Sequence, residues 1–334
     1  MNMSQEEKAY LQQIEQALKE HVFPPQLVIE TTSRCNMMCL HCSHKEMKRA
    51  RADMEESLFK RIVEEVAREM PECEIWPTFY GEALLLGDKL WRWLDYAASA
   101  GCKNIILNSN GILLGRMIDQ VLASPLKRFI LSLDALRPET FKKIRVGGSR
   151  DKIYAAVEEL LKRREQRGQK YPIIQCQFSV MQENQGEVEE FISYWKKRKA
   201  EVKTRRMLTW TSTGSIIVPG LHNDESFRIA CPWGNNAAAI HQNGNVVTCA
   251  VDYEGRYVAG NVAESSIKEI WQGAHRHQVR EPHRQHRWQD LPEICRNCPD
   301  WQVVGSRYIG SEDKSFGARP FWHQHSSHEE NICS

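Results

Sequence analysis

Short apolar runs alternate with amphipathic segments along the first two thirds of the chain. Apolar runs bounded by polar or turn residues are typical of strands, and apolar positions repeating every three to four residues are typical of helices. The predicted strands are 27–30, 74–76, 104–107, 128–133, 173–180 and a sixth around 202–210. The predicted helices are 4–20, 55–70, 89–100, 111–123, 151–166 and 187–199.

Strand and helix in regular alternation predict an α/β fold. Its sheet should be parallel, built of right-handed crossovers, and either open or curled into a barrel. Ligands in such folds bind beyond the carboxyl ends of the strands. A loop with three cysteines follows the first predicted strand, so we expect this loop at the ligand-binding end.

The alternation of strand-like and helix-like segments ends at about Leu208. Residues 211–214 and 218–224 have loop composition, and 237–249 predicts two short strands joined by an Asn243-Gly244 turn. A helix is predicted near 266–271. The segment from Gly310 onward is polar, which is typical of a terminal tail. The predicted units are an N-terminal helix at 1–24, a main domain at 25–210, a small α+β domain at 211–305 and a tail at 306–334.

The composition is that of a soluble globular protein. The chain has 334 residues, of which 41% are hydrophobic and 26% charged, with a formal net charge of +2. This charge gives no general attraction to nucleic acid or to an anionic membrane, so neither is an expected partner. The basic runs Lys196–Lys199 and Arg205-Arg206 are interpreted as solvated surface.

The cysteines are better explained by metal binding than by disulfides. No apolar run is long enough to span a bilayer, and residues 1–20 are too polar for a signal peptide, which predicts a cytoplasmic protein. The cytosol keeps thiols reduced, so eleven cysteines suggest metal ligands. Seven of them fall into two groups. Cys73, Cys102 and Cys176 are interpreted as buried structural residues.

The first group is Cys35-Asn-Met-Met-Cys39-Leu-His-Cys42. Three thiolates at this C-x3-C-x2-C spacing can share one iron–sulfur cluster and leave its fourth iron without a protein ligand. The alternatives are a zinc site completed by His41 or His44, or unrelated buried cysteines. The spacing favours the cluster, because zinc sites prefer paired C-x2-C spacings.

The second group comprises Cys231, Cys249, Cys295 and Cys298, with the pattern C-x17-C-x45-C-x2-C. Four thiolates complete a tetrahedral ligand set. This second site is therefore predicted to be closed, and it could hold either zinc or another cluster.

Residues 25–210 resemble the radical S-adenosylmethionine (SAM) superfamily, on the strength of the C-x3-C-x2-C loop after the first strand of an alternating sheet. The resemblance implies a partial (β/α)6 TIM-like barrel. It also implies that Cys35, Cys39 and Cys42 hold a [4Fe–4S] cluster whose open iron chelates SAM. One electron then cleaves SAM to a 5′-deoxyadenosyl radical, which abstracts hydrogen from a substrate.

The family has a Gly-Gly-Glu-Pro segment after the second strand that binds the methionyl amino group. Here Gly81 and Glu82 match it, whereas Tyr80 and Ala83 depart from it. The resemblance places further SAM contacts at Asn108, Ser109, Asn110, Ser132, Asp134, Arg145 and Val180. Two of these have simpler explanations, since Asn110 can cap a helix and Arg145 can be a helix-end cation.

Residues 228–302 are similar to the Twitch region, the shortened form of the SPASM domain appended to many SAM radical enzymes. This resemblance implies that Cys231, Cys249, Cys295 and Cys298 hold one auxiliary [4Fe–4S] cluster. The full SPASM pattern needs three more cysteines soon after Cys298, and 299–311 contains none. We therefore expect two [4Fe–4S] clusters in all, and SAM as the remaining cofactor.

The ligand spacing most resembles that of Twitch enzymes that oxidise a carbinol of an aminocyclitol. This implies an oxidoreductase acting on a small carbohydrate-like substrate, with the auxiliary cluster accepting an electron and a flavodoxin- or ferredoxin-type protein as reductant. Asp252 is the candidate base, although it also suits the first position of a turn. By strand alternation Gln175, Gln177 and Ser179 could face the substrate.

Two other functions remain open. A maturase or epimerase would modify a peptide or protein, and in an epimerase Cys176 could return hydrogen to the product. Only about 25 residues precede the first strand, which disfavours the peptide-modifying relatives that carry an added leader-binding domain. The third hypothesis is a zinc-stabilised binding module without catalysis.

Overall fold

The computed structural model describes residues 5–209, 227–303 and 307–309. Ten strands form one continuous sheet in the order β10-β6-β5-β4-β3-β2-β1-β7-β8-β9. The strands are β1 (Gln26–Ile29), β2 (Glu74–Trp76), β3 (Asn104–Ser109), β4 (Arg128–Ser132), β5 (Ile173–Val180), β6 (Glu201–Arg206), β7 (Ala237–Ile240), β8 (Asn245–Val247), β9 (Val258–Asn261) and β10 (Arg307–Ile309). Neighbours from β6 through β1 to β7 are parallel, which confirms the predicted α/β barrel.

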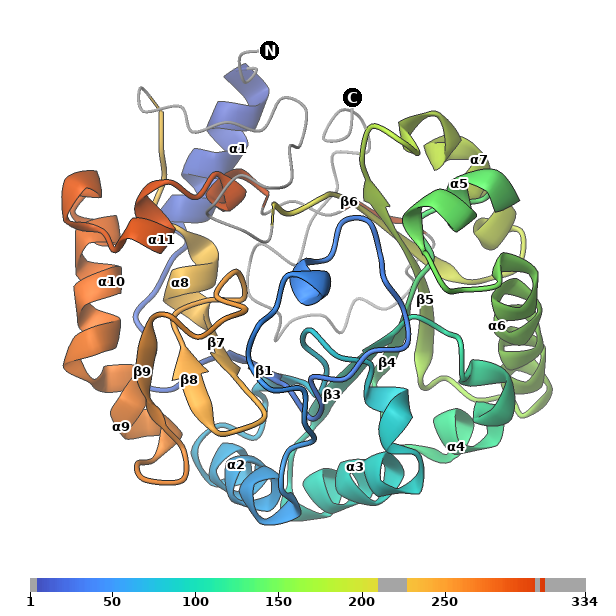
Figure 1. The fold of residues 1–334 in the computed structure, drawn as a ribbon, viewed down its shortest axis with the longest axis horizontal. Helices are drawn as coiled ribbons and strands as arrows, with labels where there is room; N and C mark the ends of the chain where they lie inside the picture. The colour runs from blue at the N-terminus through green and yellow to red at the C-terminus, as the bar shows by residue number, and fades with distance from the viewer. Residues whose placement is uncertain (1–4, 210–226, 304–306, 310–334) are drawn as a thin grey trace.

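Helices follow the strands and cover the outer face of the curved sheet (Figure 1). Around the barrel these are α2 (Glu56–Glu69), α3 (Asp88–Ala100), α4 (Ile118–Ala123), α5 (Pro138–Ile144), α6 (Arg150–Gln166) and α7 (Val188–Lys196). The remaining helices are α1 (Gln5–Gln16), α8 (Pro232–Asn236), α9 (Ile267–Gln272), α10 (Ala274–Arg284) and α11 (Glu293–Arg296). Short 3-10 turns occur at Ser43–Lys45, Ala83–Leu86, Leu114–Arg116, Gln185–Glu187, Trp288–Asp290 and Asp300–Gln302.

Strand alternation separates an apolar outer face from a polar interior. Cys176 and Phe178 of β5 point outward into the main hydrophobic core, where Phe178 contacts Phe191 of α7 with ring centroids 4.8 Å apart. Gln175 points inward and donates to Glu201, which also pairs with Arg128. The floor of the barrel is thus a buried polar network, because residues two apart on a strand share a face.

The C-terminal part continues the barrel sheet instead of forming a separate one. β7 pairs parallel to β1, and β7, β8 and β9 are antiparallel to one another. The predicted turn at Asn243-Gly244 joins β7 to β8, with Gly244 in the left-handed region at φ 89°. Ser266 and Glu269 form a capping box at the start of α9, close to the predicted helix start.

Most predicted elements agree with the structure to within a few residues. Helix α4 is shorter than predicted and begins at Ile118, because Gly111 adopts φ 79° and lies against Ile153, which a helical residue could not do. Helices α5, α8, α10 and α11 and strand β9 were not predicted. Strand β10 lies in the segment expected to be a tail, and it pairs antiparallel with β6. The rest of that tail, with His323, His325 and His328, lies outside the described residues.

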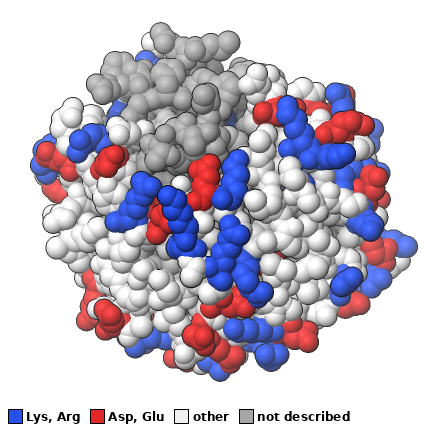
Figure 2. Space-filling model, in the orientation of Figure 1, with Lys and Arg blue, Asp and Glu red and all other residues white. Residues whose placement is uncertain are grey.

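The loop between β1 and α2 lies at the front in Figure 1, where Figure 2 shows Lys and Arg side chains gathered at the centre of the same face. Its basic residues Lys48 and Arg51 are exposed. None of the helices in the described part of the chain is long and apolar enough to cross a membrane.

Candidate active site

A single cavity lies at the carboxyl ends of the barrel strands and is lined by both cysteine groups. Cys35, Cys39 and Cys42 contribute from the loop after β1. Cys231, Cys249 and Cys298 contribute from the C-terminal part, while Cys295 does not line the cavity. The fold therefore brings together two sets of ligands that are far apart in sequence.

Backbone hydrogen bonds hold the first cysteine loop in place. The N–H of Met38 donates to Val146 O and that of Leu40 to Ile144 O, each at 2.9 Å, so the loop is fixed against the end of α5. Burial raises the pKa of Cys35 to about 11 and that of Cys42 to about 12. Bare thiolates are therefore unfavourable here, and a bound metal centre would hold these cysteines deprotonated. The donor set fits a cluster with three protein ligands.

Gly81 packs against the start of the cysteine loop. A Cβ added at this position would lie 2.0 Å from Thr32 O and 2.8 Å from Arg34 O. The N–H of Glu82 donates to the same Arg34 carbonyl at 2.8 Å. The chain approaches itself so closely here that only glycine fits, which explains in physical terms why this residue of the motif is present.

The Gly81→Ala variant should lose its first cluster and with it the cleavage of SAM. The new methyl group would collide with backbone atoms, which cannot move aside as a flexible side chain does. Iron content and 5′-deoxyadenosine formation are the measurements. The matched control is Gly186→Ala, where an added Cβ meets nothing within 4 Å. Wild-type cleavage by the Gly81→Ala protein would contradict this account of the loop.

Glu82 connects the segment after β2 to the segment after β3. Its carboxylate accepts from Ser109 Oγ at 2.9 Å, from the Asn110 N–H at 2.8 Å and from the Leu84 N–H at 3.1 Å. Burial raises the pKa of Glu82, and these donors oppose the rise. Glu82 lines the cavity, so it is placed to meet a ligand amino group while its donors orient it.

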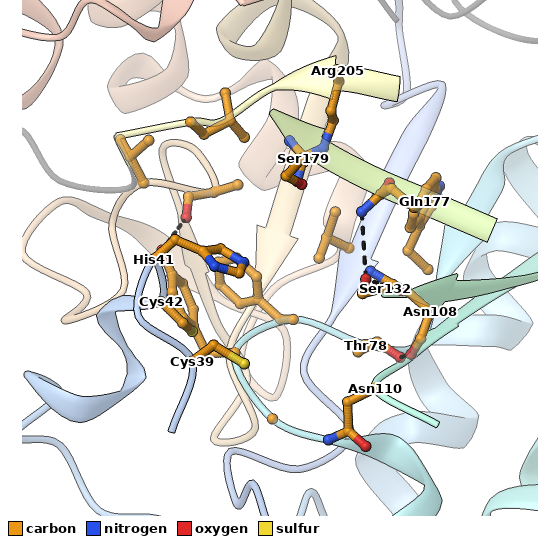
Figure 3. Close-up of a pocket in the computed structure, with 18 of the residues that line it drawn as sticks. Cys39, His41, Cys42, Thr78, Asn108, Asn110, Ser132, Gln177, Ser179 and Arg205 are labelled. Atoms are coloured by element: carbon orange, nitrogen blue, oxygen red, sulfur yellow. Dashed lines mark hydrogen bonds between the residues drawn. The ribbon is translucent and has the colours of Figure 1, made fainter. Parts of the chain in front are cut away.

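Polar side chains from β3, β4 and β5 form the wall facing the first cysteine group (Figure 3). Ser132 Oγ donates to Asn108 Oδ1 at 2.9 Å, and Gln177 Nε2 donates to Ser132 Oγ at 3.4 Å. Asn110 donates to Asn36 of the cysteine loop at 2.8 Å and accepts from the Ile112 N–H at 3.0 Å. Asn110 thus caps a turn and not helix α4, whose first residue is Ile118.

Arg145 lines the cavity beside a cluster ligand, whereas Asp134 lies behind it. Arg145 pairs with the Asp134 carboxylate and donates from Nη1 to Cys39 Sγ at 3.4 Å. Burial would raise the pKa of Asp134, but Arg145 and His41 hold it below its usual value. Asp134 also accepts from the Ser179 N–H at 2.7 Å. Its role in the structure is to hold Arg145, because its carboxylate does not reach the cavity.

One further predicted SAM contact, Val180, and one predicted substrate-facing residue, Gln175, do not line the cavity. Val180 does not line the cavity, because its carbonyl accepts from the Met207 N–H at 3.1 Å within the strand pairing. Gln175 points to the barrel floor, whereas Gln177 and Ser179 line the cavity as strand alternation indicated. Gly81, Asn108, Ser109, Ser132 and the other matched residues surround the same space.

Asp252, the candidate base, does not line the cavity. Its Oδ1 accepts from the Arg256 N–H at 2.9 Å and its Oδ2 from the Tyr257 N–H at 2.8 Å. Both carboxylate oxygens thus organise the turn after Cys249. These contacts support the turn role considered for this residue, because they bind its carboxylate to the turn and Asp252 does not line the cavity.

Tyr80 is one of the two departures from the family motif, and its contacts explain its presence. Its hydroxyl donates to Ala250 O at 2.9 Å, across 170 positions of sequence, and its ring meets Tyr253 edge-on with centroids 5.7 Å apart. Ala250 directly follows Cys249. Tyr80 therefore ties the segment of Gly81 and Glu82 to the second cysteine group, a role that a glycine could not have.

Several residues that line the cavity were not predicted from the sequence. Arg205 was interpreted as surface, yet it lines the cavity together with Lys203 of the same strand. The signal was the alternation Glu201, Lys203, Arg205, which places three charges on the inner face of β6. Asp300 also lines the cavity, and its position two residues after Cys298 was the only hint.

The second cysteine group lines the same cavity through Cys231, Cys249 and Cys298. Burial raises the pKa of Cys295 to about 12 and raises that of Cys249 as well, so these thiols would also need a metal centre to stay deprotonated. Within the described residues, no three His, Cys, Asp or Glu side chains converge closely enough to hold a single metal ion. Metal analysis is therefore the way to decide between zinc and a cluster.

Two regions of the chain match known families. Residues 29–167 match the radical SAM superfamily, and residues 231–299 match SPASM, an iron–sulfur cluster-binding domain. The first region contains Cys35, Cys39 and Cys42, and the second contains all four cysteines of the other group. A radical SAM domain implies a [4Fe–4S] cluster and SAM, and an SPASM domain implies additional iron–sulfur clusters.

Two relatives differ in how much of the chain they share. A GTP 3′,8-cyclase from Peptoclostridium acidaminophilum is 32% identical over 137 residues, which are 40% of this chain and 41% of the cyclase. The chain thus matches about two-fifths of the cyclase's length. The S-adenosyl-L-methionine-dependent 2-deoxy-scyllo-inosamine dehydrogenase from Niallia circulans is 21% identical over 281 residues, 82% of this chain and 92% of the dehydrogenase.

Solved structures share the fold at low sequence identity. BtrN in complex with AdoMet and 2-DOIA has a TM-score of 0.60 at 17% identity, covering 84% of this chain and 94% of BtrN. Streptococcus suis SuiB bound to its precursor peptide SuiA has a TM-score of 0.62 at 14% identity, covering 80% and 68%. With its three-cysteine loop in one matched domain and four further cysteines in the other, the chain combines a radical SAM domain with a C-terminal SPASM domain.

Proposed function

We propose that this enzyme oxidises a carbinol of a small carbohydrate-like or aminocyclitol substrate to a ketone. The observation that carries the proposal is the shared cavity, because both cysteine groups line it. One substrate could then lie within reach of hydrogen abstraction on one side and of an electron acceptor on the other. The likeness to an aminocyclitol dehydrogenase over 82% of the chain supports the same reaction class.

The oxidation removes a hydrogen atom, a proton and an electron from the substrate. When bound, the two clusters would supply the electron that cleaves SAM and take up the electron that the substrate releases. The hydrogen atom goes to the 5′-deoxyadenosyl group made from SAM. The proton goes to a base on the protein.

The polar wall of the barrel suits a ligand rich in hydroxyl groups. Ser132, Gln177 and Ser179 line the cavity and each has donor and acceptor capacity. Lys203 and Arg205 add cationic donors on the inner face of β6. These side chains would bind and orient the substrate against the first cysteine group.

Asp300 is the proposed base, in place of Asp252. It lies in the cavity wall beside Cys298, whose Sγ accepts from the Asp300 N–H at 3.4 Å. Thr209 donates to the carboxylate from its N–H at 2.8 Å and from its hydroxyl at 2.9 Å. These bonds fix the orientation of a carboxylate next to the electron-accepting side of the cavity.

The test uses 2-deoxy-scyllo-inosamine and related cyclitols carrying deuterium on their carbinol carbons. We expect the wild-type enzyme to move deuterium into 5′-deoxyadenosine and to form a ketone in equal amount. The Asp300→Asn variant should still move deuterium but form the ketone about a hundredfold more slowly, as expected for loss of a general base. Ketone formation by this variant at the wild-type rate would remove Asp300 from the mechanism.

Modification of a peptide or protein is the second candidate, since the fold is also that of SuiB, which has been solved with a precursor peptide. Deuterium transfer from a labelled peptide but from none of the labelled cyclitols would favour it. The binding-module hypothesis predicts colourless protein with zinc. A brown protein with about eight irons per chain would instead indicate two [4Fe–4S] clusters.

We infer that the reductant is an acidic flavodoxin- or ferredoxin-type protein. Lys48 is exposed on the loop that carries the first cysteine group, and opposite charges speed association. Lys48→Glu should slow reduction by such a protein about tenfold at low salt and leave reduction by dithionite unchanged. Lys196→Glu on α7 makes the same charge change as a control. Equal slowing by both variants would contradict a local docking site.

A further inference from the structure

Helix α10 carries an arginine that is completely buried. Arg276 has 0% of its surface exposed, and its guanidinium reaches the start of β7 and the residue after β8. Its Nη1 donates to Thr248 O, and its Nη2 donates to Gly234 O at 2.9 Å and to Ala237 O at 3.0 Å. The guanidinium also lies 4.5 Å from the centre of the Trp271 ring. Its position is therefore fixed by three carbonyls and an aromatic face.

The carbonyls belong to the segments that carry two of the auxiliary cysteines. Thr248 directly precedes Cys249, and Gly234 follows Cys231 by three residues. Because Arg276 binds both segments at once, it lies beside the second cysteine group. The hydrogen bonds of Arg276 thus hold the two segments together, and its positive charge acts on any group that Cys231 and Cys249 bind.

Arg276 forms no salt bridge with a carboxylate in the described part of the chain. The charged groups that act most strongly on it are Arg280, which is another cation, and the thiolate forms of Cys249, Cys295 and Cys231. Burial lowers the pKa of Arg276 to about 10, so the group remains a cation at neutral pH. Its Nε has no acceptor.

A buried charge without a counterion is costly. Removing an ion from water carries a penalty of several kcal/mol, which neutral carbonyls only partly offset. A burial of this kind is expected where an anionic group occupies the neighbouring site. Four thiolates around an iron–sulfur core form such a group, because the assembly is negative overall and becomes more negative when it is reduced.

We propose that Arg276 is the buried countercharge of the auxiliary iron–sulfur cluster and raises that cluster's reduction potential. A fixed cation favours the reduced, more negative state, so the centre becomes a better acceptor of the electron released by the substrate. Arg276 is a positioning residue, since it acts through the cluster and does not touch the substrate. The inference rests on the part of the proposed function in which Cys231, Cys249, Cys295 and Cys298 hold an iron–sulfur cluster. It does not rest on the identity of the substrate.

The experiment is a redox titration followed by electron paramagnetic resonance. It uses the full chain with Cys35, Cys39 and Cys42 all replaced by alanine, so that only the auxiliary cluster contributes a signal. In this background Arg276→Gln should lower the ratio of reduced to oxidised cluster at a fixed potential at least tenfold. That corresponds to a shift of about 59 mV to more negative potential for one electron.

Two further variants separate charge from shape. Arg276→Lys keeps the cation and should keep the potential close to that of the wild type even though the fork of carbonyl contacts is lost. Arg280→Gln removes the next buried cation on α10, which also lies 4.5 Å from the Trp271 ring, and should leave the potential nearly unchanged. An equal shift in the Arg280 and Arg276 variants would mean a general disturbance of the helix.

The outcomes are decisive even if one variant is unstable. Full iron content with an unchanged potential in Arg276→Gln would overturn the proposal. If Arg276→Gln cannot hold the cluster, Arg276→Lys is the decisive variant. Loss of the cluster from Arg276→Lys, or a lowered reduction potential although the charge is kept, would also overturn the proposal. No substrate is present, so failure of this inference is distinguishable from failure of the proposed carbinol oxidation.

Discussion

The Cys39→Ala variant should form no 5′-deoxyadenosine from SAM, even with dithionite as reductant. Cys39 is the buried member of the first group, and its Sγ accepts a hydrogen bond from Arg145 at 3.4 Å. Removing it leaves two thiolates, which is too few for a cluster with one open iron. Chromatography of the nucleoside products measures cleavage, and iron should fall from about eight to about four atoms per chain.

Cys35→Ala and Cys42→Ala should behave in the same way, because both residues line the same cavity. Cys176→Ala is the matched control. Its thiol is fully buried in the apolar core on the outer face of β5, so the change removes a sulfur without touching the site. Continued SAM cleavage by the Cys39→Ala protein would refute the assignment of the first site.

The Cys298→Ala variant should cleave SAM but no longer oxidise the substrate. Cys298 belongs to the second group and lines the cavity, whereas the contacts that hold the first loop do not involve it. In the proposed oxidation, loss of this electron acceptor leaves the substrate radical with no route to the ketone. The measurements are 5′-deoxyadenosine and ketone formed in the same reaction.

Cys295→Ala offers an independent check, because this ligand lies on α11 and does not line the cavity. Direct contact of Cys298 with the substrate could explain a defect in that variant, but it could not explain one at Cys295. Ketone formation at the wild-type rate by the Cys295→Ala enzyme would show that the second site does not relay electrons.

The strands were predictable because their signal is local. β5 was predicted at 173–180 and is observed at Ile173–Val180, since its outward residues alternate with inward polar ones over the whole strand. Helix α10 was missed because Arg276, Arg280 and His283 share its buried positions with only two apolar residues, Val279 and Pro282. An apolar stripe is the usual signal for a helix, and a helix that buries cations does not display one.

The candidate site also combines features that local sequence predicted with features that it did not. The spacing of Cys35, Cys39 and Cys42 indicated a cluster site, because ligands of one loop must be close in space. The position of Asp252 after Cys249 gave no information on whether its carboxylate faces the substrate or the turn. The N–H groups of Arg256 and Tyr257 decide this, and they depend on the path of the chain after the strand.

The sequence by itself determined the parallel sheet and the three-cysteine loop, because periodicity and the spacing of Cys35, Cys39 and Cys42 are relations between near neighbours. The barrel and the superfamily followed from the resemblance. Only the tertiary structure decided that the two cysteine groups share one cavity, that Tyr80 joins them and that Arg276 is buried beside the second. These facts depend on β7 pairing with β1 and on contacts such as that of Tyr80 with Ala250, 170 positions away. Such long-range pairings are selected by the closure of the whole sheet, which no short stretch of sequence encodes.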